Sequence, residues 1–189
     1  MAVQDDQSLI GEILRGNREL FGVLIKKYQK LVFTVAYRII KDEDESKDVS
    51  QDVFIKAFQN LKKFNGDAKF STWISTIAFR QSFDYLKKKQ KRSSSLDNWN
   101  NSDYDINSDS LIEIKERKIF IQKAIDLLKP EDSIIVTLYY LEEKSLNEIS
   151  EITGITINNL KARLFKSRKM LKDIFKRVDK TEINEFYER

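Results

Sequence analysis

The chain of 189 residues has no cysteine and no histidine, and their absence excludes several kinds of site. Without cysteine there is no disulfide framework, no thiolate zinc site and no cysteine nucleophile. Without histidine the chain lacks the commonest metal ligand and the commonest general base at neutral pH. No glycine-rich phosphate loop is present either. We therefore expect no metal and no cofactor, and the composition disfavours an enzyme.

Glycine and proline are scarce, with 5 and 1 residues, and this favours uninterrupted helices over a turn-rich β protein. Apolar residues make up 41% of the chain, which is enough for packed cores. No apolar run is long enough to span a membrane, and the polar N-terminus lacks the apolar core of a signal peptide. We therefore expect no membrane insertion and a cytoplasmic location.

Apolar residues that recur every three or four positions predict helices in the first half of the chain. The expected helices cover residues 8–15, 18–41, about 45–61 and 71–91, with Ser71 as the N-cap of the last. A loop at residues 64–69 carries the helix breakers Asn65, Gly66 and Asp67.

Residues 93–110 break this pattern, because they are rich in serine, asparagine and aspartate and poor in apolar residues. Such a composition predicts a flexible acidic linker. We therefore expect an all-α protein with two small helical domains, at residues 1–92 and 111–178. A tail at residues 179–189 follows and has no interpretation from the sequence.

The C-terminal domain contains the pattern of a helix-turn-helix. Ser145 and Glu148 fit an S-x-x-E capping box, Gly154 is placed as a helix stop, and Thr156 is placed to cap a long final helix. Apolar residues in this stretch would fix the crossing angle of the two helices, so that the second can enter a major groove. Residue types suited to base contacts are expected on its exposed side: Asn158, Asn159, Lys161, Ala162, Arg163, Lys166 and Ser167.

A second basic site lies on the expected helix 71–91, where Arg80, Lys87 and Lys88 alternate with aromatic residues. Positive charge beside aromatic rings suits single-stranded or distorted nucleic acid. The alternative is a solvated helix end, where lysine also interacts favourably with the helix dipole. The acidic stretch 42–52 could likewise be a solvated helix start, where carboxylates interact favourably with the positive end of the helix dipole.

Taken in order, these segments resemble the bacterial RNA polymerase sigma factors of the extracytoplasmic-function group. The first half carries DVSQDVFIKAFQNLKKF and NGDAKFSTWISTIA. The second half carries AIDLLKPEDSIIVTLYY, EKSLNEISEITGIT and NNLKARLFKSRKMLK. The resemblance covers almost the whole chain, and the order, the spacing and the linker agree with it.

The resemblance implies a sigma factor that binds core RNA polymerase, directs it to promoters and promotes DNA opening. Asp48, Gln51 and Asp52 would dock on the coiled coil of the polymerase β′ subunit, and the C-terminal domain would meet the β flap. An anti-sigma factor would be a further partner. Contacts with the promoter −10 element are expected from Phe64, Asn65, Gly66, Asp67, Lys69, Arg80, Lys87 and Lys88. Contacts with the −35 element are expected from Thr156 and the seven residues on the exposed side of the final helix.

Two other hypotheses remain open at this point. A free-standing helix-turn-helix regulator would need an effector pocket or a dimer interface, and it would bind duplex DNA tightly without polymerase. An enzyme would have to use carboxylates such as Asp48 and Asp52, which lie on a surface-like helical face without a convergent partner.

Overall fold

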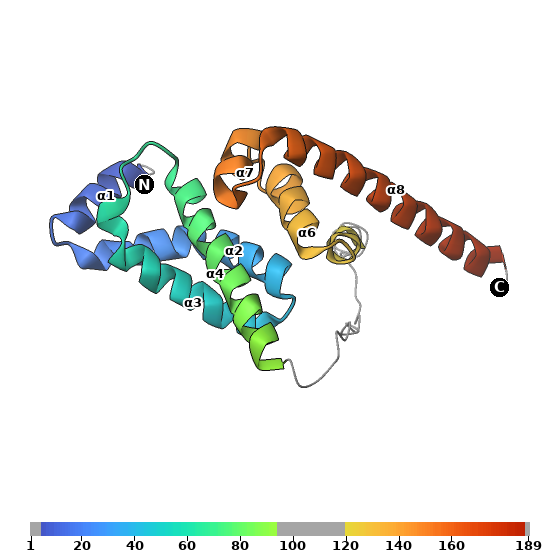
Figure 1. The fold of residues 1–189 in the computed structure, drawn as a ribbon, viewed down its shortest axis with the longest axis horizontal. Coiled ribbons are helices and arrows are strands. Elements are labelled where there is room, and N and C mark those ends of the chain that lie inside the picture. Colours follow the sequence, from blue (N-terminus) through green and yellow to red (C-terminus); the bar gives the residue numbers. More distant parts are fainter. Residues whose placement is uncertain (1–4, 94–119, 188–189) are drawn as a thin grey trace.

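The structure, a computed structural model, describes residues 5–93 and 120–187, and every regular element among them is helical (Figure 1). The prediction of an all-α protein is therefore confirmed. The predicted linker lies outside the described residues, apart from Ser93. Within the described part of the chain, no helix has the length and apolar character needed to cross a membrane.

The N-terminal domain is a bundle of four α-helices and two short 3₁₀ turns. In chain order these are α1 (Asp6–Leu14), η1 (Arg18–Leu20), α2 (Phe21–Ile40), α3 (Glu43–Gln59), η2 (Leu61–Lys63) and α4 (Phe70–Ser93). The helices α2, α3 and α4 contact one another, and α1 lies against α2 and η2. Asp42 caps α3, because its side chain accepts a hydrogen bond from the backbone N–H of Glu45 at 2.9 Å.

The predicted N-cap at Ser71 is wrong, because α4 begins one residue earlier, at Phe70. The backbone N–H groups of Thr72 and Trp73 both donate to the carbonyl oxygen of Lys69, at 2.9 and 3.1 Å. The buried ring of Phe70 packs into the core, so the first helical turn forms around it. The hydroxyl of Ser71 instead accepts a hydrogen bond from Lys144 of the other domain.

The C-terminal domain is also helical. Its described part contains a helix over residues 120–126, α6 (Pro130–Val136), the π-helical turn η3 (Thr137–Leu141), α7 (Leu146–Thr153) and α8 (Ile157–Tyr187). The π-helical turn has no counterpart in the sequence prediction. The helix α8 continues beyond Val178, where we expected it to end, through most of the predicted tail.

The predicted capping box is confirmed. The hydroxyl of Ser145 accepts a hydrogen bond from the backbone N–H of Glu148, and the Glu148 carboxylate accepts one from the backbone N–H of Ser145 at 2.9 Å. The predicted stop is also present, since Gly154 ends α7 in the left-handed conformation with φ of 73°. These two local signals set where α7 begins and ends, and therefore where α8 starts.

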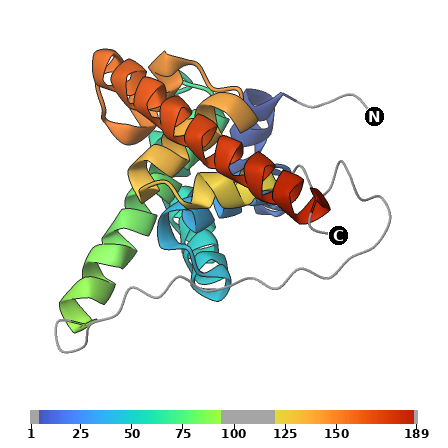
Figure 2. The ribbon, with the colours of Figure 1, turned by 90° about the vertical axis from the view of Figure 1, so that its right-hand side faces the viewer.

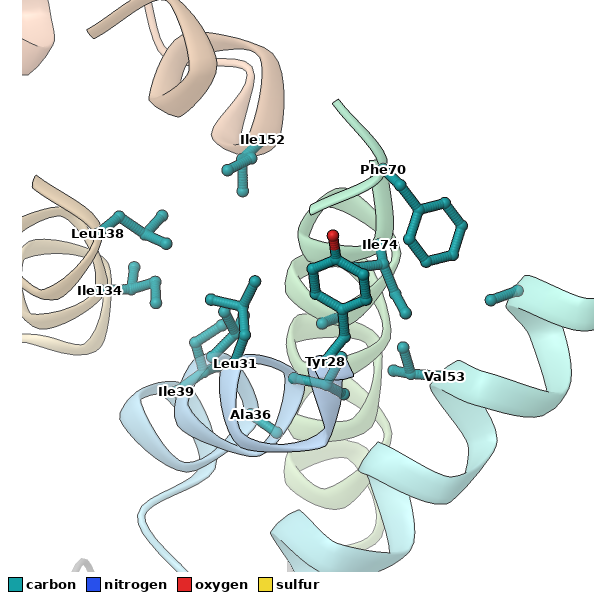
Figure 3. Close-up of a cluster of buried hydrophobic side chains, with 14 of the residues drawn as sticks. Tyr28, Leu31, Ala36, Ile39, Val53, Phe70, Ile74, Ile134, Leu138 and Ile152 are labelled. Carbon is teal, nitrogen blue, oxygen red and sulfur yellow. The ribbon is translucent and has the colours of Figure 1, made fainter. Parts of the chain in front are cut away.

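Buried apolar side chains of both domains form one continuous cluster (Figure 3). Leu31 and Ile39 of α2 lie between Ile74 of α4 on one side and Ile134 and Leu138 of the C-terminal domain on the other. The two domains are thus packed together through α2 with α6 and α4 with α7. The helix α7 lies near the N-terminal end of α4, while the basic end of α4 projects away from it in both views (Figures 1 and 2).

Candidate polymerase and nucleic-acid interfaces

An acidic face runs along α3 on the side that does not contact α2 or α4. Asp48, Gln51 and Asp52 are exposed on this face, and their spacing of three and four residues aligns them on the helix. The opposite side of α3 is apolar, and Phe54 is buried there. Ile55 shares the acidic face and is 55% exposed, which sequence reasoning missed.

The loop between η2 and α4 is held in place by contacts at both of its ends. The half-buried ring of Phe64 lies against the rings of Phe70 and Trp73, with each pair of centroids 5.5 Å apart. Gly66 adopts φ of 83°, and its carbonyl oxygen accepts a hydrogen bond from the side chain of Gln7 at 3.4 Å. Phe64 therefore anchors the loop to the core.

The exposed tip of this loop offers hydrogen-bonding groups to solvent. The side chain of Asn65 donates to the carboxylate of Asp67, and the backbone N–H of Asp67 donates back to Asn65 at 3.3 Å. Both residues are exposed, as is Lys69. The turn thus brings together the amide of Asn65, the carboxylate of Asp67 and the ammonium of Lys69 on the surface.

The exposed side of α4 is basic, as the sequence predicts. Arg80, Lys87 and Lys88 are exposed along this helix, and Lys89 is paired with Glu45 of α3 at 2.7 Å. The aromatic residues of α4 are partly buried and pack against the core, so they support the helix and leave the charge outside.

The helix α8, whose first part is the second helix of the helix-turn-helix, has a long exposed side. Leu160 and Leu164 are buried against the domain, and Asn158, Asn159, Lys161, Ala162 and Lys166 are exposed. Thr156 is exposed just before the helix. Phe165 lies among these residues and is the most exposed of the large apolar side chains in the described chain, with 69% of its surface accessible. Its ring adds a large apolar group to this side, where Ala162 is the one apolar residue of the predicted set.

Two residues of the predicted set differ from the expectation. Ser167 is buried, with 2% exposed, so the prediction that it lies on the exposed side is wrong. It follows Leu160 and Leu164 at helical spacing and therefore points into the domain. Arg163 is partly exposed and forms ion pairs with Asp132 at 2.8 Å and Glu131 at 2.7 Å, which tie α8 to the start of α6.

Glu148 links the helix-turn-helix to the loop of the other domain. Besides its role in the capping box, its carboxylate lies 3.1 Å from the ammonium of Lys69 and accepts a hydrogen bond from Thr72 at 3.4 Å. Burial alone would raise its pKa. Hydrogen bonds from Ser145 and Lys69, together with the charge of Lys144, outweigh burial and lower the pKa of Glu148 to about 2. The group is therefore a fixed negative charge at neutral pH.

These surfaces define a two-domain helical protein with an exposed acidic face on α3 and exposed basic faces on α4 and α8. Residues 24–92 match the family described as Sigma-70 region 2, and residues 121–171 match Sigma-70, region 4. The chain therefore belongs to the sigma-70 family of bacterial RNA polymerase sigma factors, in its extracytoplasmic-function group. Such a factor directs core RNA polymerase to promoters, recognising the −10 and −35 elements in transcription initiation.

Similar proteins with assigned names agree with this family. The ECF RNA polymerase sigma factor SigW of Bacillus subtilis is 26% identical over 174 residues, which cover 86% of this chain and 92% of that protein. The ECF RNA polymerase sigma-E factor of Escherichia coli is 27% identical over 176 residues, covering 88% and 92%.

Solved structures share the fold. The sigma factor RpoE of Bartonella quintana, in complex with the anti-sigma factor NepR, matches with a TM-score of 0.69 at 18% identity, over 82% of this chain and 96% of that one. CnrH in complex with the cytosolic domain of CnrY matches with a TM-score of 0.66 at 18% identity, over 90% and 97%.

Proposed function

We propose that this sigma factor divides promoter recognition between its two domains and joins core RNA polymerase through α3. The observation that carries the proposal is the order of the surfaces. An acidic face, a preset loop and a basic helix occur within the region 2 match, and an exposed basic helix occurs within the region 4 match. Each domain alone would bind promoter DNA modestly. Once both domains are attached to polymerase, the second DNA contact becomes intramolecular.

Docking on the β′ coiled coil is assigned to Asp48, Gln51 and Asp52, with Ile55 as an added apolar contact. Exposed carboxylates attract a basic partner over long range, and the neighbouring apolar side chain excludes water once the surfaces meet. The C-terminal domain would contact the β flap. This proposal places the protein in the cytoplasm, where it would work with RNA polymerase, and an anti-sigma factor that masks it would be a further partner.

Recognition of the −10 element is assigned to the loop tip and the basic side of α4. A base displaced from the duplex would be held by the residues of the loop tip: Asn65, Gly66, Asp67 and Lys69. Phe64 would anchor the loop through its ring contacts with the core. Unstacking a base costs a few kcal/mol, which the loop contacts and the polymerase together offset. Positive charges at Arg80, Lys87 and Lys88 would contact the DNA backbone.

Recognition of the −35 element is assigned to α8 entering the major groove. Asn158 and Asn159 can bond adenine, Lys161 and Lys166 can bond guanine or phosphate, and Ala162 and Phe165 can pack on thymine methyl groups. Thr156 would donate to phosphate at the helix start. Ser167 is left out because it is buried, and Arg163 would need to leave its carboxylate partners in order to reach DNA.

The test is binding of the purified full chain to core RNA polymerase, measured beside two variants. Asp48→Lys/Asp52→Lys reverses two charges on the proposed face. Glu43→Lys/Asp44→Lys makes the same charge change at the exposed start of the same helix and serves as the control. We expect the first variant to bind at least about tenfold more weakly, since repulsion replaces attraction.

The control should bind as the natural chain does. Equal affinity of all three chains would contradict the docking face. A chain that ignores polymerase but binds a specific duplex tightly on its own would support the free-standing regulator instead.

A further inference from the structure

Three charged side chains join α8 to the start of α6, and we call them the α6–α8 clamp: Glu131, Asp132 and Arg163. The Nη1 atom of Arg163 lies 2.8 Å from Oδ1 of Asp132, and its Nη2 atom lies 2.7 Å from Oε2 of Glu131. One planar guanidinium therefore bonds the carboxylates of two neighbouring residues at once. Because its donors lie in a fixed plane, this arrangement restricts the orientation of α8 more than a single ammonium contact would.

The start of α6 holds the two carboxylates of the clamp in place. Glu131 and Asp132 lie in the first turn of this helix, where negative charge interacts favourably with the helix dipole. The backbone N–H of Asp132 also donates to the carbonyl oxygen of Lys129 at 2.9 Å. The side chain of Asp132 is 18% exposed, so it is largely enclosed by the domain. The first turn of α6 is thus a fixed point against which α8 can be held.

Arg163 lies at the boundary between the buried and the exposed sides of α8. Leu160 and Leu164, which flank it along the helix, are 0% and 4% exposed and pack into the core. Asn159 and Lys166 are exposed, on the side to which base contacts are assigned above. The helices α6 and α8 also contact each other. A guanidinium at this boundary can therefore set the tilt of α8 relative to α6 without taking a place on the side that meets the bases.

The same pairing makes Arg163 unsuited to reading a base. An arginine reads guanine by directing two nitrogens of its fork at O6 and N7 of the base. In Arg163 both terminal nitrogens bond carboxylates instead. Withdrawal of the guanidinium toward DNA would leave two carboxylates without their counter-charge beside the helix that approaches the phosphates, and like charges repel.

We propose that Arg163 is a positioning residue for −35 recognition, which acts through Glu131 and Asp132 to hold α8 at the angle that base contacts require. The inference rests on the proposed role of α8 at the −35 element, whereas the clamp itself does not. Hydrogen bonds weaken steeply when donor and acceptor leave the range of about 2.7–3.2 Å, so a small change in tilt removes base contacts. Loss of the clamp should therefore lower discrimination between DNA sequences more than it lowers overall affinity for DNA.

The test uses holoenzymes reconstituted from core RNA polymerase and each full-length chain. Each is titrated with a promoter duplex found by mapping transcript starts, and with the same duplex carrying a scrambled −35 element. The readout is the discrimination ratio, the dissociation constant for the scrambled duplex divided by that for the natural one.

Two variants remove the clamp from opposite sides. Arg163→Met removes both ion pairs and keeps a long apolar stem, and Glu131→Gln/Asp132→Asn removes them while keeping the side-chain shapes. We expect each variant to lower the discrimination ratio by about tenfold, which is the discrimination that one bidentate base contact provides. All three substitutions together should lower it no further, because either variant already removes the whole clamp.

The carboxylate variant distinguishes positioning from direct DNA contact by the sign of its effect. If Arg163 bound DNA, freeing the guanidinium and removing two negative charges would leave the discrimination ratio unchanged or raise it. If the clamp only stabilised the fold, partial unfolding would weaken binding to both duplexes by the same factor, and the ratio would not change. The control is Glu143→Gln/Glu151→Gln, which removes two exposed carboxylates of the same domain and should keep the natural ratio.

A natural discrimination ratio for folded Glu131→Gln/Asp132→Asn would overturn the proposal, whatever Arg163→Met shows. If Arg163→Met does not fold by circular dichroism, the carboxylate variant decides alone. A natural chain that binds both duplexes equally would overturn the proposed −35 role of α8 and this inference with it. A natural chain that discriminates, beside clamp variants that discriminate equally well, would overturn the inference alone.

Discussion

The capping box of α7 supports a quantitative prediction about the helix-turn-helix. Ser145→Ala removes the hydroxyl that accepts the backbone N–H of Glu148 at 3.2 Å. Loss of such a cap costs about 1 kcal/mol of helix stability. For a chain of 189 residues, this corresponds to a melting temperature lower by about 2–4 °C. Ser145→Thr keeps a hydroxyl at the same place and should lose much less.

The measurement is thermal unfolding of the full chain, with hydrogen exchange of the α7 amides as the local readout. Exchange should become faster in α7 of Ser145→Ala while it stays unchanged in α3. Binding of a −35 duplex should persist well below the melting temperature, because the reading residues on α8 are intact. The reasoning would be refuted if Ser145→Ala unfolded with the natural chain, or if Ser145→Thr unfolded as early as Ser145→Ala.

Two further predictions concern the same motif. Because the pKa of Glu148 is lowered from 4.5 to about 2, its stabilising contribution is present above pH 4.5 and is lost as the pH falls toward 2. Urea unfolding should therefore show a difference between the natural chain and Glu148→Gln that shrinks over that range, and a constant difference would contradict the assignment. Gly154→Ala should destabilise by about 1 kcal/mol, since a left-handed residue with a Cβ is strained although no atom lies within 4 Å of that Cβ. Gly154→Asn should lose less in the same urea experiment, and equal losses would show that the conformation is not the cause.

Features of the fold that depend on neighbouring residues could be predicted from the sequence. The capping box at Ser145, the stop at Gly154 and the exposed acidic face of α3 all follow from short-range spacing. The burial of Ser167 was also available from spacing, because it continues the stripe of Leu160 and Leu164. Its polar type predicts exposure, but its position on the helix determines its burial.

Features that depend on distant residues could not be predicted in this way. Arg38 and Asp126 are 88 positions apart, and nothing in either local sequence indicates that they meet. The helix α4 starts one residue before the predicted position for a related reason. Burial of Phe70 sets its first turn, and the hydroxyl of Ser71 is bonded to Lys144 of the other domain. The place of Phe64 in the loop predicts a DNA contact, whereas the contacts of its ring with Phe70 and Trp73 depend on the fold.

Reconstituted transcription with core RNA polymerase on a pool of genomic promoter fragments, with the transcript start sites mapped, shows whether the chain directs polymerase to promoters. We expect that adding the chain produces transcripts from a limited set of starts. Those starts should share two upstream sequence elements at a constant spacing. Asp48→Lys/Asp52→Lys should abolish these transcripts, while Glu43→Lys/Asp44→Lys should not. Transcription that is the same with and without the chain, although the chain is folded and the polymerase is active, would contradict the claim that it is a promoter-directing sigma factor.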